Sequence, residues 1–265
     1  MDPIASPGFA ASARSALGLL RTGNEDSALL HSRLIAVADG MGGHAGGEVA
    51  SALAITTLAG LIKILEEGEL DADSAEDLLL HSLHDVDGEI GRAARAQKDL
   101  LGMGTTLSAL MLYNSGDESS VALLHVGDSR CYRLREGELL QLSHDHTVLQ
   151  EMLDQKIVST QEALEHPHRS LLTQAVMGED SLSPVLMVYP IKINDRFLLC
   201  SDGLSGVIDE KEIKSSLKIS DRDEAIAHMI ELVYQVGAPD NVTIVIADLI
   251  AESSSTQITF LGAAG

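Results

Sequence analysis

The sequence predicts an α+β fold in which two antiparallel β-sheets face each other and helices cover their outer faces. Short apolar runs follow one another with turn residues between them, which is typical of antiparallel hairpins. Helical patterns come in separate blocks, so a regular βαβ alternation is not indicated. Residues 29–38 and 196–201 are rich in apolar residues, and packed sheets with helices outside would bury both faces of such strands.

The first half of the chain supplies two strands, two helices and a meander. Residues 1–13 are small and polar, and we expect them to be loosely ordered. A glycine-dense stretch precedes the first helical pattern, and the second begins on capping residues. Strands are predicted at 15–20 and 28–38, helices at 48–65 and 74–96, and hairpin strands at 105–113, 120–127, 130–136 and 138–143.

The second half begins with a different kind of segment. Residues 144–183 are polar and predict short helices and loops inserted between strands. Further strands are predicted at 185–188, 196–200 and 241–249, with helices at 208–217 and 223–236. Residues 251–265 form a weakly patterned tail. No composition typical of a linker interrupts residues 14–250, which are therefore expected to form a single domain.

The net charge of −22 restricts the partners of this chain. Binding to nucleic acid requires lysine and arginine to displace counterions, so no nucleic-acid partner is expected. The same charge repels anionic membrane surfaces. A site that handles phosphate on such a chain needs local positive charge, which metal ions can supply.

Cysteine content and hydropathy indicate a cytoplasmic protein. Cys131 and Cys200 lie in apolar, strand-like runs and are expected to be buried, reduced thiols. No apolar run suggests a membrane span, and the first residues lack the basic start and apolar centre of a signal peptide.

Four aspartates lie where apolar strands end or begin. They are Asp39, Asp128, Asp202 and Asp240. One such aspartate is ordinary turn chemistry, but four can converge on one edge of a packed sandwich. Carboxylates brought together repel one another unless a cation neutralises them, and oxygen ligands select Mg²⁺, Mn²⁺ or Ca²⁺ over Zn²⁺.

Two neighbouring features have two interpretations each. The glycines at 40–47 could form a flexible turn or let the backbone approach an ion or phosphate, and they do not match a P-loop. Arg21, four residues before Glu25, could bind phosphate bidentately or form a surface ion pair. Spacing alone does not choose between these interpretations.

An ordered set of segments resembles the bacterial branch of the PPM (PP2C-type) metal-dependent protein phosphatase family. Any one of them would be a weak signal, whereas the ordered set is highly specific. The resemblance covers roughly residues 15–249, and its segments are RTGNEDS, ADGMGGHAGGEVAS, GMGTTLSAL, HVGDSRCYRLREGEL, LSHDHTVLQEML, HPHRSLLTQAVMG, FLLCSDGL and PDNVTIVI.

The resemblance implies a four-layer αββα sandwich with a metal cluster at one end. Asp39 would bridge two Mn²⁺ or Mg²⁺ ions, and the Gly40 carbonyl would bind the second ion. Asp202 and Asp240 would complete the first ion site. Arg21 would contact the substrate phosphate.

The resemblance also implies an outer set of groups. Glu25 and Asp26 would support the second ion through bound water, and Asp128 would hold a third ion. Residues 144–183 would be the variable flap that influences substrate choice. Met41 stands where some relatives have a histidine, and His44 or a water on the third ion would protonate the leaving oxygen.

The implied activity is hydrolysis of phosphoserine and phosphothreonine monoesters by metal-activated water. The expected partners are phosphoproteins and a Ser/Thr kinase whose action the enzyme opposes, and the expected state is a monomer. One alternative is a catalytically silent relative that binds partners, but every expected carboxylate is present. Another is a phosphatase for nucleotides or other small molecules, which would use the same metal chemistry.

Overall fold

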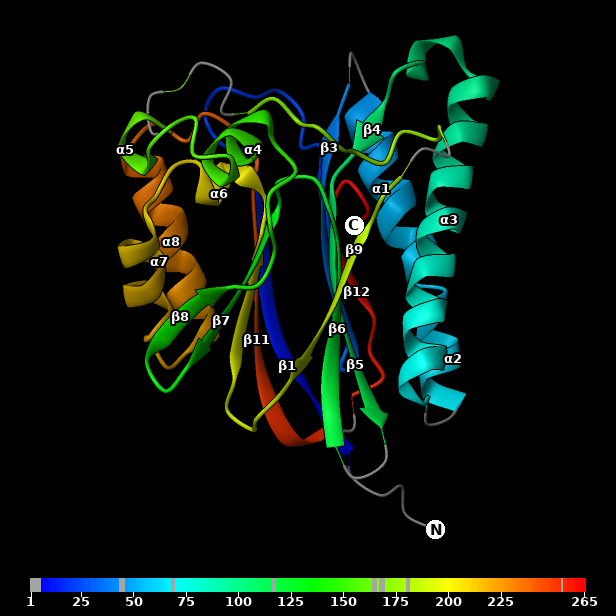
Figure 1. Ribbon diagram of the computed structural model, residues 1–265, viewed down its shortest axis with the longest axis vertical. Coiled ribbons are helices and arrows are strands. Elements are labelled where there is room, and N and C mark those ends of the chain that lie inside the picture. The colour runs from blue at the N-terminus through cyan, green and yellow to red at the C-terminus, as the bar shows by residue number, and fades with distance from the viewer. Residues whose placement is uncertain are drawn as a thin grey trace.

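Two β-sheets pack face to face between two layers of helices in the computed structural model of the chain (Figure 1). The structure describes residues 6–42, 46–67, 70–115, 118–163, 166, 170–179, 182–253 and 255–265. The predicted four-layer sandwich of two antiparallel sheets flanked by helices is confirmed.

The first sheet has five strands in the order β1-β11-β10-β7-β8. Each neighbouring pair is antiparallel, and β11 lies between β1 and β10. The strands are β1 (Ser6–Ala16), β7 (Arg130–Arg135), β8 (Glu138–Gln141), β10 (Arg196–Cys200) and β11 (Val242–Ser253).

The second sheet has seven strands in the order β12-β2-β3-β5-β6-β9, with the short β4 paired to β3. It is also antiparallel throughout. Its strands are β2 (Asp26–Leu30), β3 (Leu34–Met41), β4 (Gly104–Thr105), β5 (Leu107–Ser115), β6 (Glu118–Val126), β9 (Val185–Pro190) and β12 (Thr259–Gly262).

The helices divide between the two outer faces and one end of the sandwich (Figure 1). Those beside the seven-stranded sheet are α1 (Gly46–Leu58), α2 (Leu61–Glu67) and α3 (Ala72–Ala96), followed by the 3₁₀ turn η1 (Lys98–Leu100). Those beside the five-stranded sheet are α7 (Glu210–Leu217) and α8 (Arg222–Gln235). Short helices at the upper end are α4 (Val148–Asp154), α5 (Thr160–Ala163) and α6 (Asp202–Ser205).

Three apolar layers hold these elements together, one between the sheets and one under each helical layer. In the central layer the rings of Phe9 and Phe197 meet edge to face with centroids 5.9 Å apart. Cys131 lies in the layer between the sheets and Cys200 in the layer under α7 and α8. Both are buried and free, as predicted, and burial raises the pKa of the Cys200 thiol to about 12.

Several segments differ from the sequence-based expectations. Residues 6–13, predicted to be loosely ordered, form most of β1, and the strand predicted at 15–20 ends at Ala16. Part of the predicted tail forms β12, which pairs with β2. These strands lack strong apolar alternation and are held by the partners that β11 and β2 offer along their edges. The helix predicted at 48–65 is divided by a turn at Ala59 and Gly60.

One helical stretch, Gly46–Glu67, is long and apolar enough to cross a membrane, judged by length and composition alone. No apolar run of this kind was expected from the sequence. It comprises α1 and α2 with the turn between them. Its buried residues, Ala54, Ile55 and Leu58 among them, belong to the layer under the seven-stranded sheet. Packing in this core is a sufficient reason for the apolar composition.

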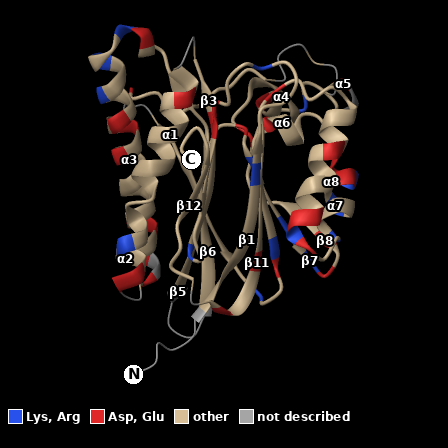
Figure 2. Cartoon of the chain, turned by 180° about the vertical axis from the view of Figure 1, so that it is seen from behind, with Lys and Arg blue, Asp and Glu red and all other residues tan. Residues whose placement is uncertain are grey.

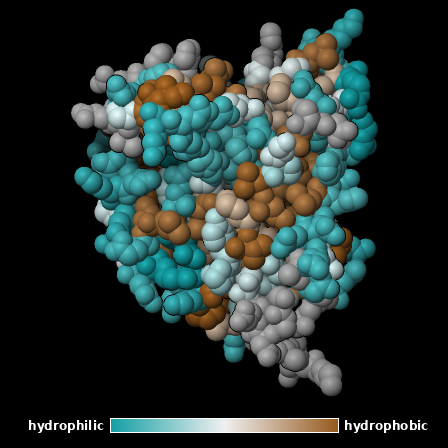
Figure 3. Space-filling model, viewed as in Figure 1, coloured by the Kyte–Doolittle hydropathy of each residue, from teal (hydrophilic) through white to brown (hydrophobic). Residues whose placement is uncertain are grey.

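The charge of the chain is spread over the helical faces. Figure 2 shows acidic residues along the outer faces of α3, α7 and α8, which face away from the sheets. Figure 3 shows apolar side chains on the front of the molecule, in the region of the edge strand β9, where Val188 is exposed.

Candidate active site

The four strand-terminal aspartates meet at the upper end of the sandwich, as the sequence predicts. Asp39 lies in β3 two residues before its end, and Asp128 lies in the turn between β6 and β7. Asp202 is the first residue of α6, directly after β10 and Ser201, and Asp240 precedes β11. Figure 2 shows acidic residues at this end near β3 and beside α4 and α6.

All four carboxylates line one open cavity of about 670 Å³. Arg21, Glu25 and Gly40 line the same cavity. Seven of the nine predicted site residues are therefore brought together by elements far apart in the sequence. Of the other two, Asp26 lies beneath the cavity, and His44 falls outside the described residues.

Asp39 is fixed by strand pairing and by two threonines from the segment GMGTT. Its backbone N–H donates to Thr106 Oγ1 at 3.0 Å, and its carbonyl accepts from the Thr106 N–H at 2.8 Å and from Thr105 Oγ1 at 2.9 Å. Thr106 also lines the cavity. Three hydrogen bonds to the Asp39 backbone thus hold this residue at a fixed place on the cavity wall.

The same threonine connects Asp39 to the turn that carries Asp128. The Oγ atoms of Thr106 and Ser129 are 2.6 Å apart, and Ser129 follows Asp128 in the chain. Ser108 Oγ donates to the Ser129 carbonyl at 2.7 Å. The relative position of the two aspartates is thus set by buried hydroxyl groups on β5 and on the segment before it.

Asp26 occupies a second layer below the cavity. Its backbone is paired opposite Asp39 in the β2–β3 ladder, and its side chain is almost fully buried. Asp26 Oδ2 accepts a 2.8 Å hydrogen bond from Ser201 Oγ, and Ser201 Oγ in turn accepts from the Thr243 N–H at 3.0 Å. Asp26 therefore joins the start of β2 to the ends of β10 and β11, directly behind the cavity.

Asn241 holds the loop that carries Arg21. Its Oδ1 accepts from the Glu25 N–H at 2.8 Å, while its Nδ2 donates to the carbonyls of Leu17 at 2.9 Å and Gly23 at 3.0 Å. One buried side chain thus braces both ends of residues 17–25. The Arg21 guanidinium then reaches across to donate to Asp240 Oδ2 at 2.6 Å.

Gly40 and Glu25 complete the wall near the first turn of α1. A Cβ atom on Gly40 would lie 2.0 Å from the Gly47 carbonyl oxygen, so only glycine allows β3 and α1 to approach this closely. The Glu25 carboxylate lies against Gly47 and is near the positive end of the α1 dipole. The close approach leaves the Gly40 backbone on the cavity wall.

The carboxylates that line the cavity repel one another. Burial raises the pKa of Asp39 well above its ordinary value, and Asp26, Asp202, Asp128 and Asp240 raise it further by repulsion. Burial raises the pKa of Asp128 to about 7, with repulsion from Asp202 adding to it, and burial and then Asp240 raise the pKa of Asp202. The cavity thus holds more negative charge than its surroundings stabilise.

This excess of negative charge fits divalent cations. The donors are carboxylates and one backbone carbonyl, which suit Mg²⁺ or Mn²⁺ and not a metal that prefers sulfur or imidazole. Within the described ranges, no three His, Cys, Asp or Glu side chains are already arranged to hold an ion. Asp240 is turned to Arg21, so ion binding requires its carboxylate to be shared or released.

A second cavity of about 480 Å³ adjoins the first and shares Arg21, Asp128, Asp202 and Asp240 with it. It extends between α4, which belongs to the predicted flap segment, and α6. Arg130, which forms an ion pair with Asp145, lies on the wall of this second cavity. The space next to the carboxylates is therefore large enough for groups beyond a single phosphate.

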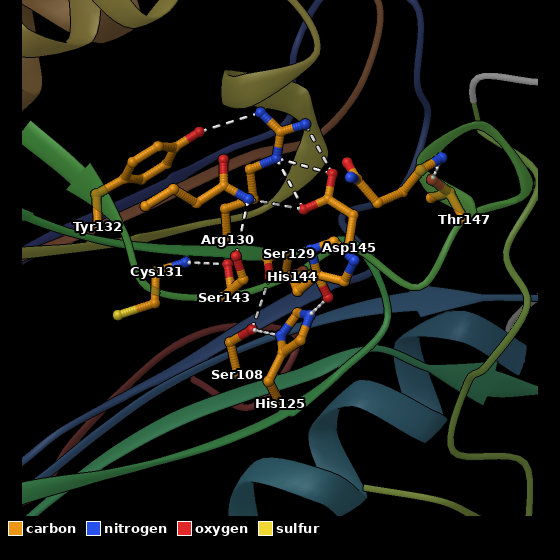
Figure 4. A network of polar contacts seen from close by, with 12 residues as sticks. Ser108, His125, Ser129, Arg130, Cys131, Tyr132, Ser143, His144, Asp145 and Thr147 are labelled. Atoms are coloured by element: carbon orange, nitrogen blue, oxygen red, sulfur yellow. Dashed lines mark hydrogen bonds and ion pairs between the residues drawn. The ribbon is translucent and has the colours of Figure 1, made fainter. Parts of the chain in front are cut away.

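Arg130 ties the flap segment to the five-stranded sheet (Figure 4). Its Nε donates to both oxygens of Asp145, its Nη2 donates to Asp145 Oδ2 at 2.7 Å, and its Nη1 donates to the Tyr132 hydroxyl at 3.1 Å. Asp145 is nearly buried. A fork-shaped pair of this kind fixes both partners, so the start of the flap is anchored two residues from Asp128.

A buried histidine lies beneath the same turn. His125 Nδ1 and Ser108 Oγ are 2.9 Å apart, and His125 Nε2 is 3.0 Å from the His144 carbonyl oxygen (Figure 4). The rings of His125 and His146 have centroids 5.0 Å apart, and His146 Nδ1 accepts from the Gly127 N–H at 3.1 Å. These histidines support the Asp128 turn.

Sequence reasoning assigned no role to Thr106, Asn241, Ser201 or Arg130, although each lies in one of the segments that carry the resemblance. Small polar residues of this kind are common in turns and gave no separate signal. Their importance is visible only from the hydrogen bonds that they make to residues distant in the sequence, as between Thr106 and Ser129, which are 23 positions apart.

Comparison with known proteins agrees with this geometry. The family model described as Protein phosphatase 2C matches residues 24–248. The chain belongs to the protein phosphatase 2C family. Among curated members of the family, it is 42% identical over 257 residues to the serine/threonine protein phosphatase PstP of Mycobacterium tuberculosis, and 33% identical over 244 residues to the serine/threonine phosphatase stp of Listeria monocytogenes.

The match to the M. tuberculosis protein covers 95% of this chain but only 47% of that protein, so the chain spans about half its length. The match to the Listeria protein covers 89% of this chain and 94% of that protein. Solved structures of this phosphatase 2C family have the same fold. The catalytic domain of PstP in complex with two manganese ions superimposes with a TM-score of 0.82 at 39% identity, covering 92% of this chain and all of that one. Stp1 of Staphylococcus aureus gives 0.81 at 27% identity, with 91% and 94% covered.

Proposed function

We propose that the chain is a metal-dependent protein serine/threonine phosphatase that hydrolyses phosphoserine and phosphothreonine monoesters. The observation that carries the proposal is the cavity in which Asp39, Asp128, Asp202 and Asp240 face the cationic Arg21. Two relatives of similar sequence bear the name serine/threonine phosphatase, and one of them was crystallised with two manganese ions.

The site binds two Mn²⁺ or Mg²⁺ ions in this proposal. Asp39 would bind both metal ions, and the Gly40 carbonyl would bind the second of them. Asp202 and Asp240 would bind the first. Glu25 and Asp26 would support the other through water, Asp26 from its buried place behind the wall. Asp128 would hold a third ion. When bound, the cations neutralise phosphate charge and lower the pKa of water.

Arg21 orients the substrate. Its guanidinium is about half exposed and lies over the cavity, with one hydrogen bond to Asp240. A guanidinium has five N–H donors, so others can donate to two phosphate oxygens while Asp240 keeps the plane of the group fixed. A phosphate held in this way presents the bond to its serine or threonine oxygen at a constant angle to the carboxylates.

The leaving oxygen requires a proton. His44 is the proposed side-chain source, and it lies outside the described residues. The second possibility is a water on the third ion, which Asp128 would hold while its own position is fixed through Ser129. In the first case a substitution of His44 should lower activity, and in the second a substitution of Asp128 should do so.

The proposal also covers the partners, the oligomeric state and the location of the protein. An enzyme of this kind would act on phosphoproteins in opposition to a Ser/Thr kinase, and we propose a monomer in the cytoplasm. A catalytically silent binding module is less favoured because Glu25 and the four strand-terminal aspartates line one cavity. A small-molecule phosphatase would use the same carboxylates, so only substrate comparison separates it from a protein phosphatase.

The test is hydrolysis of a phosphothreonine peptide, p-nitrophenyl phosphate and ATP with Mn²⁺ present. We expect turnover of the first two, loss of it with EDTA, and recovery with added Mn²⁺. Asp202→Asn should reduce turnover at least a hundredfold, since it removes one charged ligand. Rapid hydrolysis of ATP, with no hydrolysis of the phosphothreonine peptide, would support the small-molecule alternative. No turnover of any substrate would support the silent module.

A further inference from the structure

An uncharged, apolar surface adjoins Arg21 at the rim of the cavity. It consists of two segments, residues 15–20 and 234–239, neither of which contains a charged residue in a chain of which 22% is charged. Within these two segments the most exposed apolar side chains are Leu20 at 74%, Val236 at 63% and Leu19 at 59%. We call the surface formed by Leu17, Leu19, Leu20, Tyr234 and Val236 the apolar ridge.

The two segments of the apolar ridge lie against each other. The Leu19 N–H donates to the Ala238 carbonyl at 2.8 Å. Gly18 has a φ of +76°, and a Cβ there would lie 2.1 Å from the Asp240 carbonyl oxygen, so the loop backbone is in contact with the segment before β11. Leu19 and Val236, far apart in sequence, are thereby held on the same rim.

The apolar ridge is also held rigidly. The Asn241 side chain braces the loop through Leu17 and Gly23, and the last turn of α8 passes directly into Ala238. A surface that is already ordered loses little conformational freedom when a partner covers it. Contiguous exposed apolar patches mark interaction sites more often than singly scattered apolar residues do.

The position of the apolar ridge indicates its occupant. Leu20 precedes Arg21 and Leu19 is two residues from it, so both Cα atoms lie within about 7 Å of the Arg21 Cα. An extended peptide advances about 3.3 Å per residue, so its side chains two to four residues from the phosphorylated residue are about 7–13 Å from the phosphate-bearing residue. When Arg21 holds the phosphate, such a side chain reaches the apolar ridge.

We propose that the apolar ridge binds a large apolar side chain of the phosphoprotein substrate, two to four residues from the phosphorylated serine or threonine. This inference rests on the proposed function and specifies the substrate class of that site. The apolar ridge would select substrates by sequence next to the phosphate, and it would leave the chemical step unaffected because it touches no reacting group.

The test compares three substrates with Mn²⁺ present. Two of them are phosphothreonine peptides that differ only at the positions two to four residues before and after the phosphothreonine. These positions are leucine in one peptide and serine in the other. The third substrate is p-nitrophenyl phosphate. Burying part of one leucine should lower KM for the leucine peptide about tenfold relative to the serine peptide. Similar kcat values are expected for the two peptides.

The double variant Leu19→Ser, Val236→Ser removes the apolar contact without touching Arg21. We expect it to raise KM for the leucine peptide about tenfold, to leave kcat unchanged and to abolish the difference between the peptides. Hydrolysis of p-nitrophenyl phosphate, which is too small to reach the apolar ridge, should be unchanged. Leu140→Ser on β8, where the side chain is 50% exposed, is the matched control and should change none of these values.

Two results with an active wild-type protein would overturn the inference. Equal KM values for both peptides in the wild-type protein would show that the apolar ridge does not contact the residues beside the phosphate. A wild-type dimer in sedimentation velocity that the double variant abolishes, with KM unchanged, would show that the apolar ridge binds a second copy. If the wild-type protein hydrolyses none of the substrates, the proposed function fails first and this inference with it.

Discussion

Arg21 Nη2 donates a 2.6 Å hydrogen bond to Asp240 Oδ2, joining two residues that are 219 positions apart. Both side chains are partly exposed and both line the same cavity. The pair connects the group proposed to hold the substrate phosphate with a carboxylate proposed to hold a cation. Binding of phosphate and binding of metal are therefore expected to influence each other.

Removing the Arg21 guanidinium should weaken substrate binding. We expect Arg21→Ala to lower kcat/KM for a phosphothreonine peptide about 10–100-fold, mainly through KM, because a charge-assisted pair of hydrogen bonds to phosphate is lost. Arg21→Lys should recover part of the loss, since it restores the charge without the fork-shaped geometry. Steady-state kinetics on both variants would check this, and a wild-type KM for Arg21→Ala would remove Arg21 from the phosphate site.

Replacing Asp39 should have opposite effects on activity and on the stability of the metal-free protein. Asp39→Asn removes one member of a group of desolvated, mutually repelling carboxylates, so the Tm in EDTA should rise by about 2–6 °C. The same variant should lose nearly all turnover and most of the Tm increase that Mn²⁺ gives the wild-type protein. Thermal unfolding with and without Mn²⁺ would measure both effects. A lower Tm in EDTA would contradict the repulsion argument.

Asp128 should contribute to turnover without being essential for the two-ion site. Asp128→Ala is expected to lower kcat about 10–100-fold and to leave Mn²⁺ binding by the other carboxylates detectable in a calorimetric titration. One fewer bound ion per chain is the expected stoichiometry. Unchanged kcat together with unchanged stoichiometry would argue against an ion at Asp128.

Asn241 should matter through the Arg21 loop. Asn241→Ala removes the acceptor of the Glu25 N–H and the donor to the Leu17 and Gly23 carbonyls, leaving three backbone groups without these partners. We expect faster hydrogen exchange at Glu25 and Leu19, a KM raised about tenfold and a smaller change in kcat. Exchange rates equal to those of the wild-type protein would show that the loop is held by other contacts.

The buried His125 should make stability depend on pH. Burial lowers the pKa of His125 to about 3, whereas the unfolded chain has a value near 6.5. Below about pH 6.5 the unfolded state binds a proton that the folded state does not, so the free energy of unfolding should fall by about 1.4 kcal/mol per pH unit from this group.

The slope can be isolated by comparing variants. The difference in the free energy of unfolding between wild-type protein and His125→Asn should narrow by about 1 kcal/mol between pH 6.5 and pH 5.5, measured with urea in EDTA, because the unfolded histidine is already half protonated at pH 6.5. His228→Asn, on an exposed position of α8, is the matched control and should leave the slope unchanged. Parallel curves for wild type and His125→Asn over this range would show that His125 is not held neutral by the fold.

Local sequence patterns predicted most of the sandwich because burial imposes them. The alternation of apolar runs and turn residues placed β5, β6, β7, β10 and β11 within a few residues of their observed bounds. The single strand predicted at 28–38 is instead divided into β2 and β3, which form an antiparallel pair. The same patterns placed Asp39, Asp128, Asp202 and Asp240 near strand ends, since a carboxylate cannot continue into an apolar layer. Convergence of these ends follows from packing two sheets face to face.

Of the four edge strands, β8 and β9 were predicted, but most of β1 and all of β12 were not predictable in this way. Residues 6–13 and 259–262 carry weak patterns, and each becomes a strand by filling the hydrogen-bonding edge of β11 or β2. Propensity decides little where a neighbouring strand supplies all the backbone partners. The break between α1 and α2 at Gly60 was likewise missed, because apolar periodicity continues across it.

The sequence by itself determined the fold class, the family and the identity of the carboxylates, because each depends on residue types in order along the chain. Only the tertiary structure decided that Asp26 lies behind the cavity wall, that Arg21 pairs with Asp240, and that an uncharged rim adjoins them. Each of these depends on contacts between residues more than 150 positions apart, as with Asp26 and Ser201 at 175. Such contacts are selected by the packing of the two sheets and leave no pattern in neighbouring residues.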